Sequence, residues 1–115
     1  MAITQYASGT ETVSTTEWSL TTDTAGPDVD TTDGVFQVFL DLNALAASDV
    51  FEFRVYEKVL TGSTQRLVYS AAFAGPQGNP VWASPALMLL FGWDCTLIKI
   101  SGTDRSIDWS IRYAP

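Results

Sequence analysis

Histidine is absent from this chain, and cysteine occurs only once. Without histidine, the commonest general base is missing, together with the usual serine and cysteine triads and most zinc sites. A single cysteine cannot form an intramolecular disulfide, and Cys95 lies in the apolar stretch DCTLIKIS, where a buried thiol behaves as a small hydrophobic group. These absences favour a non-enzymatic protein without a cofactor, made in a reducing cytoplasm.

Basic residues are also scarce. Six Lys and Arg stand against 13 Asp and Glu, and none of the six lies in the first 33 residues. Direct binding of nucleic acid requires clustered cations, so we expect no nucleic-acid partner. The longest apolar run, Ala86–Phe91, is far shorter than the roughly 20 residues of a membrane-spanning helix. The first residues lack a basic start and an apolar segment, so we expect neither a membrane anchor nor a signal peptide.

Apolar and polar residues alternate along several short stretches, which is the pattern of half-buried β-strands. The pattern predicts strands at residues 34–42, 49–60, 65–73, 81–84, 94–101 and 106–113. The turn sequence TGST predicts a hairpin between the second and third of these, and NALAASD, with Asn43 as a possible cap, predicts a single helical turn. Six or seven short strands in 115 residues predict one all-β domain with very little helix, either an antiparallel β-sandwich or a small barrel.

Residues 1–33 differ from the rest in composition. They are rich in Thr and Ser, which favour extended backbone and turns over helix. We interpret them as an extended N-terminal arm, a strand around Thr16–Thr22 and an acidic loop, with residues 34–115 forming the sandwich.

The acidic loop, DTAGPDVDTTDG (Asp23–Gly34), is the strongest candidate for a metal site. Counted from Asp28, a calcium loop of the EF-hand type would need a ligand at the fifth position, glycine at the sixth and glutamate at the twelfth. The chain has Thr32, Asp33 and Phe39 there. Three interpretations stay open: a solvated loop whose aspartates form Asx-turns, a weak calcium site, or an acidic contact surface.

Four tryptophans in so short a chain also require an explanation. Such rings stack on sugars, but they more often fill a β-sandwich core or a subunit interface. Trp109 is in register with Ile107 and Ile111, which predicts a core position. The apolar run Ala86–Phe91, flanked by Trp82 and Trp93, is either core or a contact between subunits.

The order of features from Gly34 to Tyr113 resembles a group of small virion proteins of tailed bacteriophages. The shared features are a strand ending in DLNAL, the strand DVFEFRVYE, and the ending SGTDRSIDW. The resemblance implies a jelly-roll-like β-sandwich, a trimer, and a role as a capsid decoration (cement) protein that binds the major capsid protein on the outer surface of the virion. A carbohydrate-binding or host-adhesion module on the tail or shell is the alternative.

Two groups of residues follow from this hypothesis. Contacts with the capsid or a neighbouring subunit are predicted for Tyr6, Trp18, Asp28, Asp30 and Asp33. Self-association is predicted for Trp82, Leu87, Leu89, Phe91 and Trp93.

Overall fold

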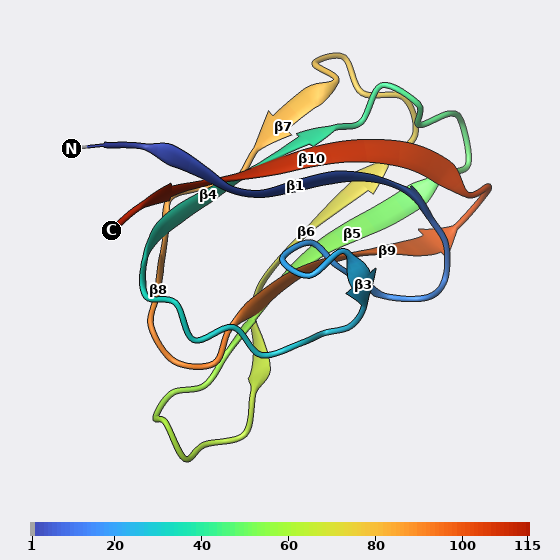
Figure 1. Ribbon diagram of the computed structural model, residues 1–115. Helices are drawn as coiled ribbons and strands as arrows, with labels where there is room; N and C mark the ends of the chain where they lie inside the picture. The colour runs from blue at the N-terminus through green and yellow to red at the C-terminus, as the bar shows by residue number, and fades with distance from the viewer. Residues whose placement is uncertain (1) are drawn as a thin grey trace.

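The computed structural model describes residues 2–115 as two antiparallel β-sheets packed face to face, with no helix in that range (Figure 1). The first sheet contains, in spatial order, β1 (Thr4–Val13), β10 (Arg105–Ala114), β4 (Gly34–Asp41) and β7 (Val81–Ala83), with β8 (Leu87–Leu89) also paired with β4. The second contains β3 (Thr24–Ala25), β2 (Trp18–Ser19), β9 (Asp94–Ser101), β5 (Val50–Glu57) and β6 (Arg66–Ala74). This confirms the predicted all-β sandwich. The jelly-roll topology stays a prediction.

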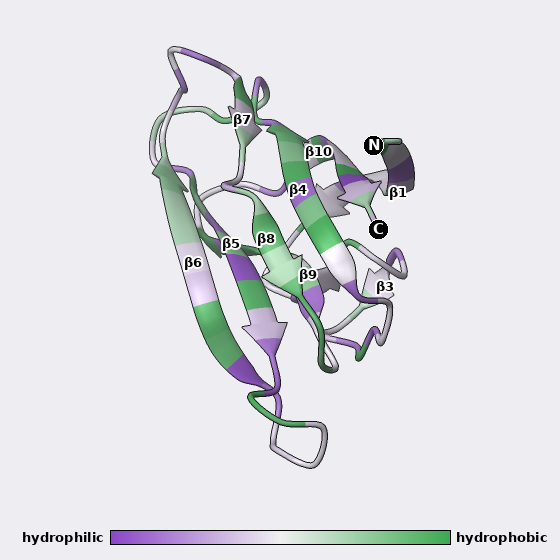
Figure 2. Cartoon of the chain, turned by 90° about the vertical axis from the view of Figure 1, so that its left-hand side faces the viewer, coloured by the Kyte–Doolittle hydropathy of each residue, from purple (hydrophilic) through white to green (hydrophobic). Residues whose placement is uncertain are grey.

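The core lies between the two sheets and is formed by alternate residues of the longer strands. Figure 2 shows hydrophobic and hydrophilic bands succeeding one another along β4 and β5. The fully buried side chains of these strands and of β10 include Phe36, Val38, Leu40, Phe51, Phe53, Val55, Ile107 and Ile111. Cys95 and Trp109 are buried among them, as predicted. The period-two pattern therefore identified the inward face of each of these strands correctly.

The connection between β4 and β5 differs from the expectation. Instead of a helical turn, residues 43–49 form two successive tight turns. Aspartates satisfy the backbone donors there, because Asp41 Oδ1 accepts from the Asn43 amide at 3.0 Å and Asp49 Oδ2 accepts from the Ala46 amide at 2.8 Å. Asn43 is thus not the capping residue. The β5–β6 hairpin is as predicted, with a bulge between Val55 and Tyr56.

The N-terminal stretch is part of the sandwich and not an arm outside it. Strand β1 pairs with β10 from Thr4 opposite Tyr113 to Val13 opposite Arg105. Gly9 lies directly over an indole, since a Cβ at Gly9 would be 2.6 Å from the Trp109 ring. Of the strand expected around Thr16–Thr22, only Trp18–Ser19 pairs, with β9 and β3. The small and polar residues of β1 concealed this strand, because its close packing depends on a partner distant in the sequence.

Strands β7 and β8 form an interrupted edge along β4. Both pair with β4, β7 near its C-terminal end and β8 near its N-terminal end. Between them the buried Ser84 donates its backbone N–H to Val38 O at 2.8 Å, and its Oγ accepts from Val38 N at 2.9 Å. Ser84 thereby continues the pairing with β4 up to Pro85. Strand β8 then lies within the apolar run Ala86–Phe91.

Candidate functional site

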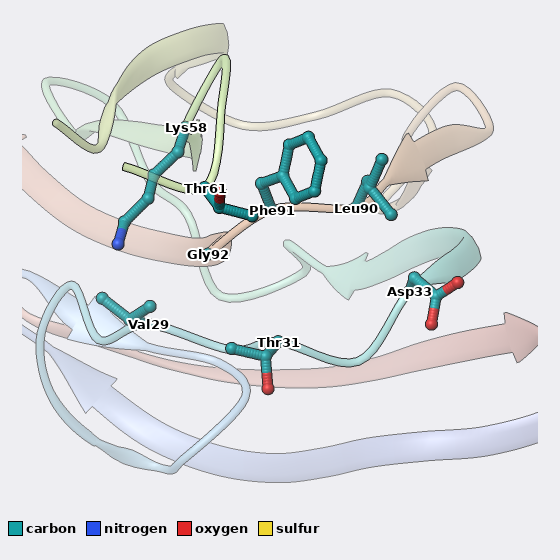
Figure 3. A pocket seen from close by; sticks show the side chains of 8 residues that line it. All are labelled: Val29, Thr31, Asp33, Lys58, Thr61, Leu90, Phe91 and Gly92. Carbon is teal, nitrogen blue, oxygen red and sulfur yellow. The ribbon is translucent and has the colours of Figure 1, made fainter. Parts of the chain in front are cut away.

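A cleft opens at the end of the sandwich where the β5–β6 and β8–β9 loops meet the segment before β4 (Figure 3). Its volume is about 460 Å³. We call it the sandwich-end cleft, and its lining residues are Val29, Thr31, Asp33, Lys58, Thr61, Leu90, Phe91 and Gly92. Its lining combines Asp33, from the N-terminal stretch, with Leu90 and Phe91 of the apolar run.

One wall of the cleft is tied to the end of β5. The Glu57 carboxylate accepts from the backbone amides of Leu90 at 2.7 Å and Phe91 at 3.0 Å. The Lys58 amide donates to Phe91 O at 3.0 Å. These hydrogen bonds satisfy backbone groups of Leu90 and Phe91, the two residues that follow β8, and therefore hold them in place.

The opposite wall is the segment before β4, which is bonded to the start of β9. Asp30 and Trp93 exchange backbone hydrogen bonds of 2.7 and 2.9 Å, and Trp93 Nε1 donates to Thr32 O at 2.7 Å. The Gln65 side-chain amide bridges the walls, because its Nε2 donates to Asp28 O at 2.8 Å and to Gly92 O at 3.1 Å. The cleft is thus preformed.

The buried carboxylate of Asp94 holds the same segment at Asp28. Asp94 accepts from Thr21 Oγ1 at 2.6 Å and from the Asp28 amide at 2.8 Å. Burial raises the pKa of Asp94, while these hydrogen bonds act in the opposite direction. Because both oxygens are occupied by the fold, we assign Asp94 a structural role.

The floor of the cleft requires a glycine. Gly92 has a φ of 49°, and a Cβ there would be 2.8 Å from Lys58 Cε and 3.2 Å from Val29 Cγ1. The aliphatic part of Lys58 therefore lies against the backbone while the ammonium group is free, with no carboxylate in ion-pair range among residues 2–115. Figure 3 shows Lys58 and Asp33 at opposite ends of the cleft, with Phe91 and Leu90 between them.

The residues predicted to contact a partner lie in different places. Tyr6 and Asp30 are brought together, since Tyr6 Oη donates to Asp30 Oδ2 at 2.7 Å. Burial, followed by this hydrogen bond, raises the pKa of Tyr6. Asp33 lines the sandwich-end cleft. Trp18 belongs to β2 and donates from Nε1 to Asp23 Oδ1 at 3.0 Å.

Three of the four aspartates of the acidic loop are occupied by hydrogen bonds: Asp23, which is bonded to Trp18, and Asp28 and Asp30. Asp28 Oδ2 accepts from the Thr22 hydroxyl at 2.6 Å and the Thr24 hydroxyl at 3.2 Å, and Asp30 Oδ1 accepts from the Thr32 amide at 2.8 Å. The last contact, to the residue two positions on, is an Asx-turn. Within residues 2–115, no three acidic or cysteine side chains come together in an arrangement that could hold a metal ion.

Of the five residues predicted for self-association, two lie inside the monomer and two more pack against its core. Trp93 is completely buried and Leu89 nearly so, which removes both from any surface of the folded chain. Trp82 and Leu87 are half-buried and pack against the core. Phe91 is half-buried in the sandwich-end cleft.

The exposed members of the apolar run are those that the prediction omitted. Met88 is 82% exposed and Leu90 is 51% exposed. The run begins as strand β8, in which successive side chains point to opposite faces, so Leu87 and Leu89 point inward and Met88 outward. Strand alternation applied to LML would have identified Met88.

The tryptophans do not form a stacking surface. Trp93 packs on Phe36 with ring centroids 4.4 Å apart, and Trp109 Nε1 donates to Leu20 O at 3.0 Å. The two half-buried indoles, Trp18 and Trp82, belong to different sheets. Trp82 packs between Phe53 and Phe73, at centroid distances of 5.2 and 5.0 Å. The geometry therefore does not favour the alternative of a sugar-binding groove.

No protein-family model matches the chain, and no curated protein matches it in sequence. Among residues 2–115, the structure contains no helix that could cross a membrane.

Proposed function

We propose that this protein is a non-enzymatic structural component of a tailed-bacteriophage virion, a capsid decoration protein that binds the major capsid protein and stabilises the head. One observation carries the proposal: apolar side chains are exposed together around one end of the sandwich. Val29 and Leu90 line the sandwich-end cleft and are 54% and 51% exposed, and Val59 and Leu60, which lie in the chain between the cleft residues Lys58 and Thr61, are 80% and 64% exposed. An exposed apolar group of this kind is typical of a surface that another protein covers.

The construction of the rest of the molecule agrees with a docking role. Within residues 2–115, every buried side-chain nitrogen or oxygen has a hydrogen-bond partner. The loops at the apolar end are fixed by Glu57 and Gln65, as described above, so binding there would require little ordering of the backbone. Asp33, which precedes β4, lines the same end and would complement a basic group of a partner.

The resemblance of residues 34–113 to phage virion proteins supplies the identity of the partner, the capsid shell, and the trimer as the proposed assembly. Fold by itself does not determine function. The proposal therefore depends on both the resemblance and the exposed apolar end.

A reconstitution experiment tests this function. Capsids that lack the protein are heated with and without added protein, and DNA release is followed by dye fluorescence. We expect the added protein to raise the release temperature, and Leu60→Asp to abolish the effect. Val68→Asp, at a 55% exposed position on β6, is the matched control and should retain it. Absence of the chain from purified virions, or no change in release temperature on adding it, would refute the proposal.

A further inference from the structure

We propose that the sandwich-end cleft binds a short extended segment of a partner protein, in which an apolar side chain stands next to a carboxylate. That the partner is the major capsid protein rests on the proposed function. The binding preference itself rests on the cleft.

The walls of the cleft select an apolar side chain. Val29, Leu90 and Phe91 line it, and its volume of about 460 Å³ falls within the range of roughly 300–1,000 Å³ that is usual for ligand sites. Leu90 and Val29 are both more than half exposed in the free protein. Covering them with an apolar side chain removes this surface from water and supplies the driving force for binding.

The cation in the cleft selects the neighbouring carboxylate. Among residues 2–115, Lys58, Arg66 and Arg112 have no ion-pair partner, and of these three only Lys58 lines the cleft. Its ammonium group lies at one end of an apolar cleft, where an opposite charge is attracted more strongly than in open water. Asp33 at the other end repels an anion, which gives the bound segment a direction (Figure 3).

Because the chain is acidic overall, a preference for an acidic peptide distinguishes binding in the cleft from non-specific binding. The chain carries a net charge of −7, so non-specific attraction favours basic peptides. A preference for an acidic peptide can arise only from a local cation that outweighs the general field, and Lys58 occupies that position. The order of affinity among peptides therefore distinguishes binding in the cleft from binding to the acidic surface.

The test is an NMR titration with three blocked peptides of identical length. The probe is Ac-Gly-Glu-Leu-Gly-NH2, and the controls are Ac-Gly-Lys-Leu-Gly-NH2 and Ac-Gly-Glu-Ser-Gly-NH2. We expect the probe to shift the backbone amide signals of Leu90, Phe91 and Gly92 in a saturable manner. Each control should bind about five-fold more weakly, which corresponds to one exposed ion pair or one partly covered side chain. A stronger response to the basic peptide, or equal responses to all three, would overturn the inference.

Two variants assign the preference to the cleft. Lys58→Gln removes the charge and shortens the side chain that lies over Gly92, and should lower the affinity for the probe about five-fold. Arg66→Gln, at an exposed residue on β6 outside the cleft, changes the net charge equally and should leave the affinity unchanged. Equal loss in both variants would contradict the assignment to Lys58.

The peptide assay tests the cleft inference and the capsid assay tests the proposed function, so either can fail while the other succeeds. Probe binding without capsid binding would leave the cleft inference intact and refute the proposed function. Capsid binding by Lys58→Gln as tight as by the unmodified protein would refute the role of the cleft in docking, while the decoration function stands.

Discussion

At the scale of single residues, Asp49 is a buried carboxylate held by three hydrogen bonds. It accepts from the Thr103 amide at 3.0 Å, the Ala46 amide at 2.8 Å and Arg105 Nε at 2.7 Å. The neighbouring Gly102 has a φ of 94°, and a Cβ there would collide with Asp49. The β9–β10 turn is thus built around this carboxylate, which joins it to the β4–β5 connection.

These contacts make stability depend on pH in a defined window. The backbone amides of Thr103 and Ala46, followed by Arg105, lower the pKa of Asp49 to about 2. Because the folded-state pKa lies below the ordinary value of about 3.9, the stabilisation is fully present above pH 4 and is lost as the pH falls towards 2. We expect the melting temperature to fall over this interval. In Asp49→Asn it should be lower at pH 7 and should change less between pH 4 and pH 2.

The comparison variant is Asp33→Asn, at an exposed residue in no ion pair among residues 2–115. It should retain the acid dependence of the unmodified protein in calorimetric scans. An identical acid dependence in Asp49→Asn would show that other groups are responsible.

At the scale of elements, the interrupted edge formed by β7 and β8 depends on one hydroxyl group. Ser84→Ala removes the acceptor of the Val38 amide and leaves that buried donor without a partner. The expected loss is about 1–3 kcal/mol in the free energy of unfolding. Ser70→Ala, at an exposed position of β6, should change it by less than about 0.5 kcal/mol.

Urea denaturation measures both variants. A Ser84→Ala protein as stable as the unmodified chain would mean that water or a shifted backbone replaces the hydroxyl. The amide of Val38 would then exchange with deuterium no faster than before, which provides a second measurement at the same position.

The same elements show how far the sequence predicts the fold. Strands β4, β5 and β10 could be predicted because each has one apolar and one polar face, so the period-two pattern records burial directly. Strand β8 was missed because all three of its residues are large and apolar, so the run lacks the apolar–polar alternation that marks a half-buried strand, and the outward position of Met88 follows only once the strand is known.

The candidate site was only partly predictable for a related reason. Asp33 and Phe91 were predicted as contact residues from local composition, and the structure places both at the sandwich-end cleft. Lys58 was missed, because its importance arises from the approach of Val29 and Gly92, which lie far from it in the sequence. Spacing along the chain contains no information on that approach.

At the scale of the whole molecule, residues 4–13 can unfold either together with the rest of the sandwich or separately from it. An unfolding experiment distinguishes these two possibilities. Composition suggested an arm, whereas β1 pairs with β10 along its whole length and ends in the buried Val13. A strand held by ladder hydrogen bonds and by the packing of Gly9 on Trp109 belongs to the same cooperative unit as the core. We therefore expect a single unfolding transition that includes residues 4–13.

Proteolysis by an enzyme specific for glutamate tests this expectation, since Glu11 lies within β1. In the native protein, cleavage after Glu11 should be no faster than global unfolding. Gly9→Val intrudes on the Trp109 ring, so it should cost about 1–3 kcal/mol and speed this cleavage at least about five-fold. Gly78→Val, where an added Cβ meets nothing within 4 Å, should leave the rate unchanged. Rapid removal of residues 1–11 from an otherwise intact sandwich would instead show that β1 detaches on its own, and that the N-terminal stretch behaves as an arm after all.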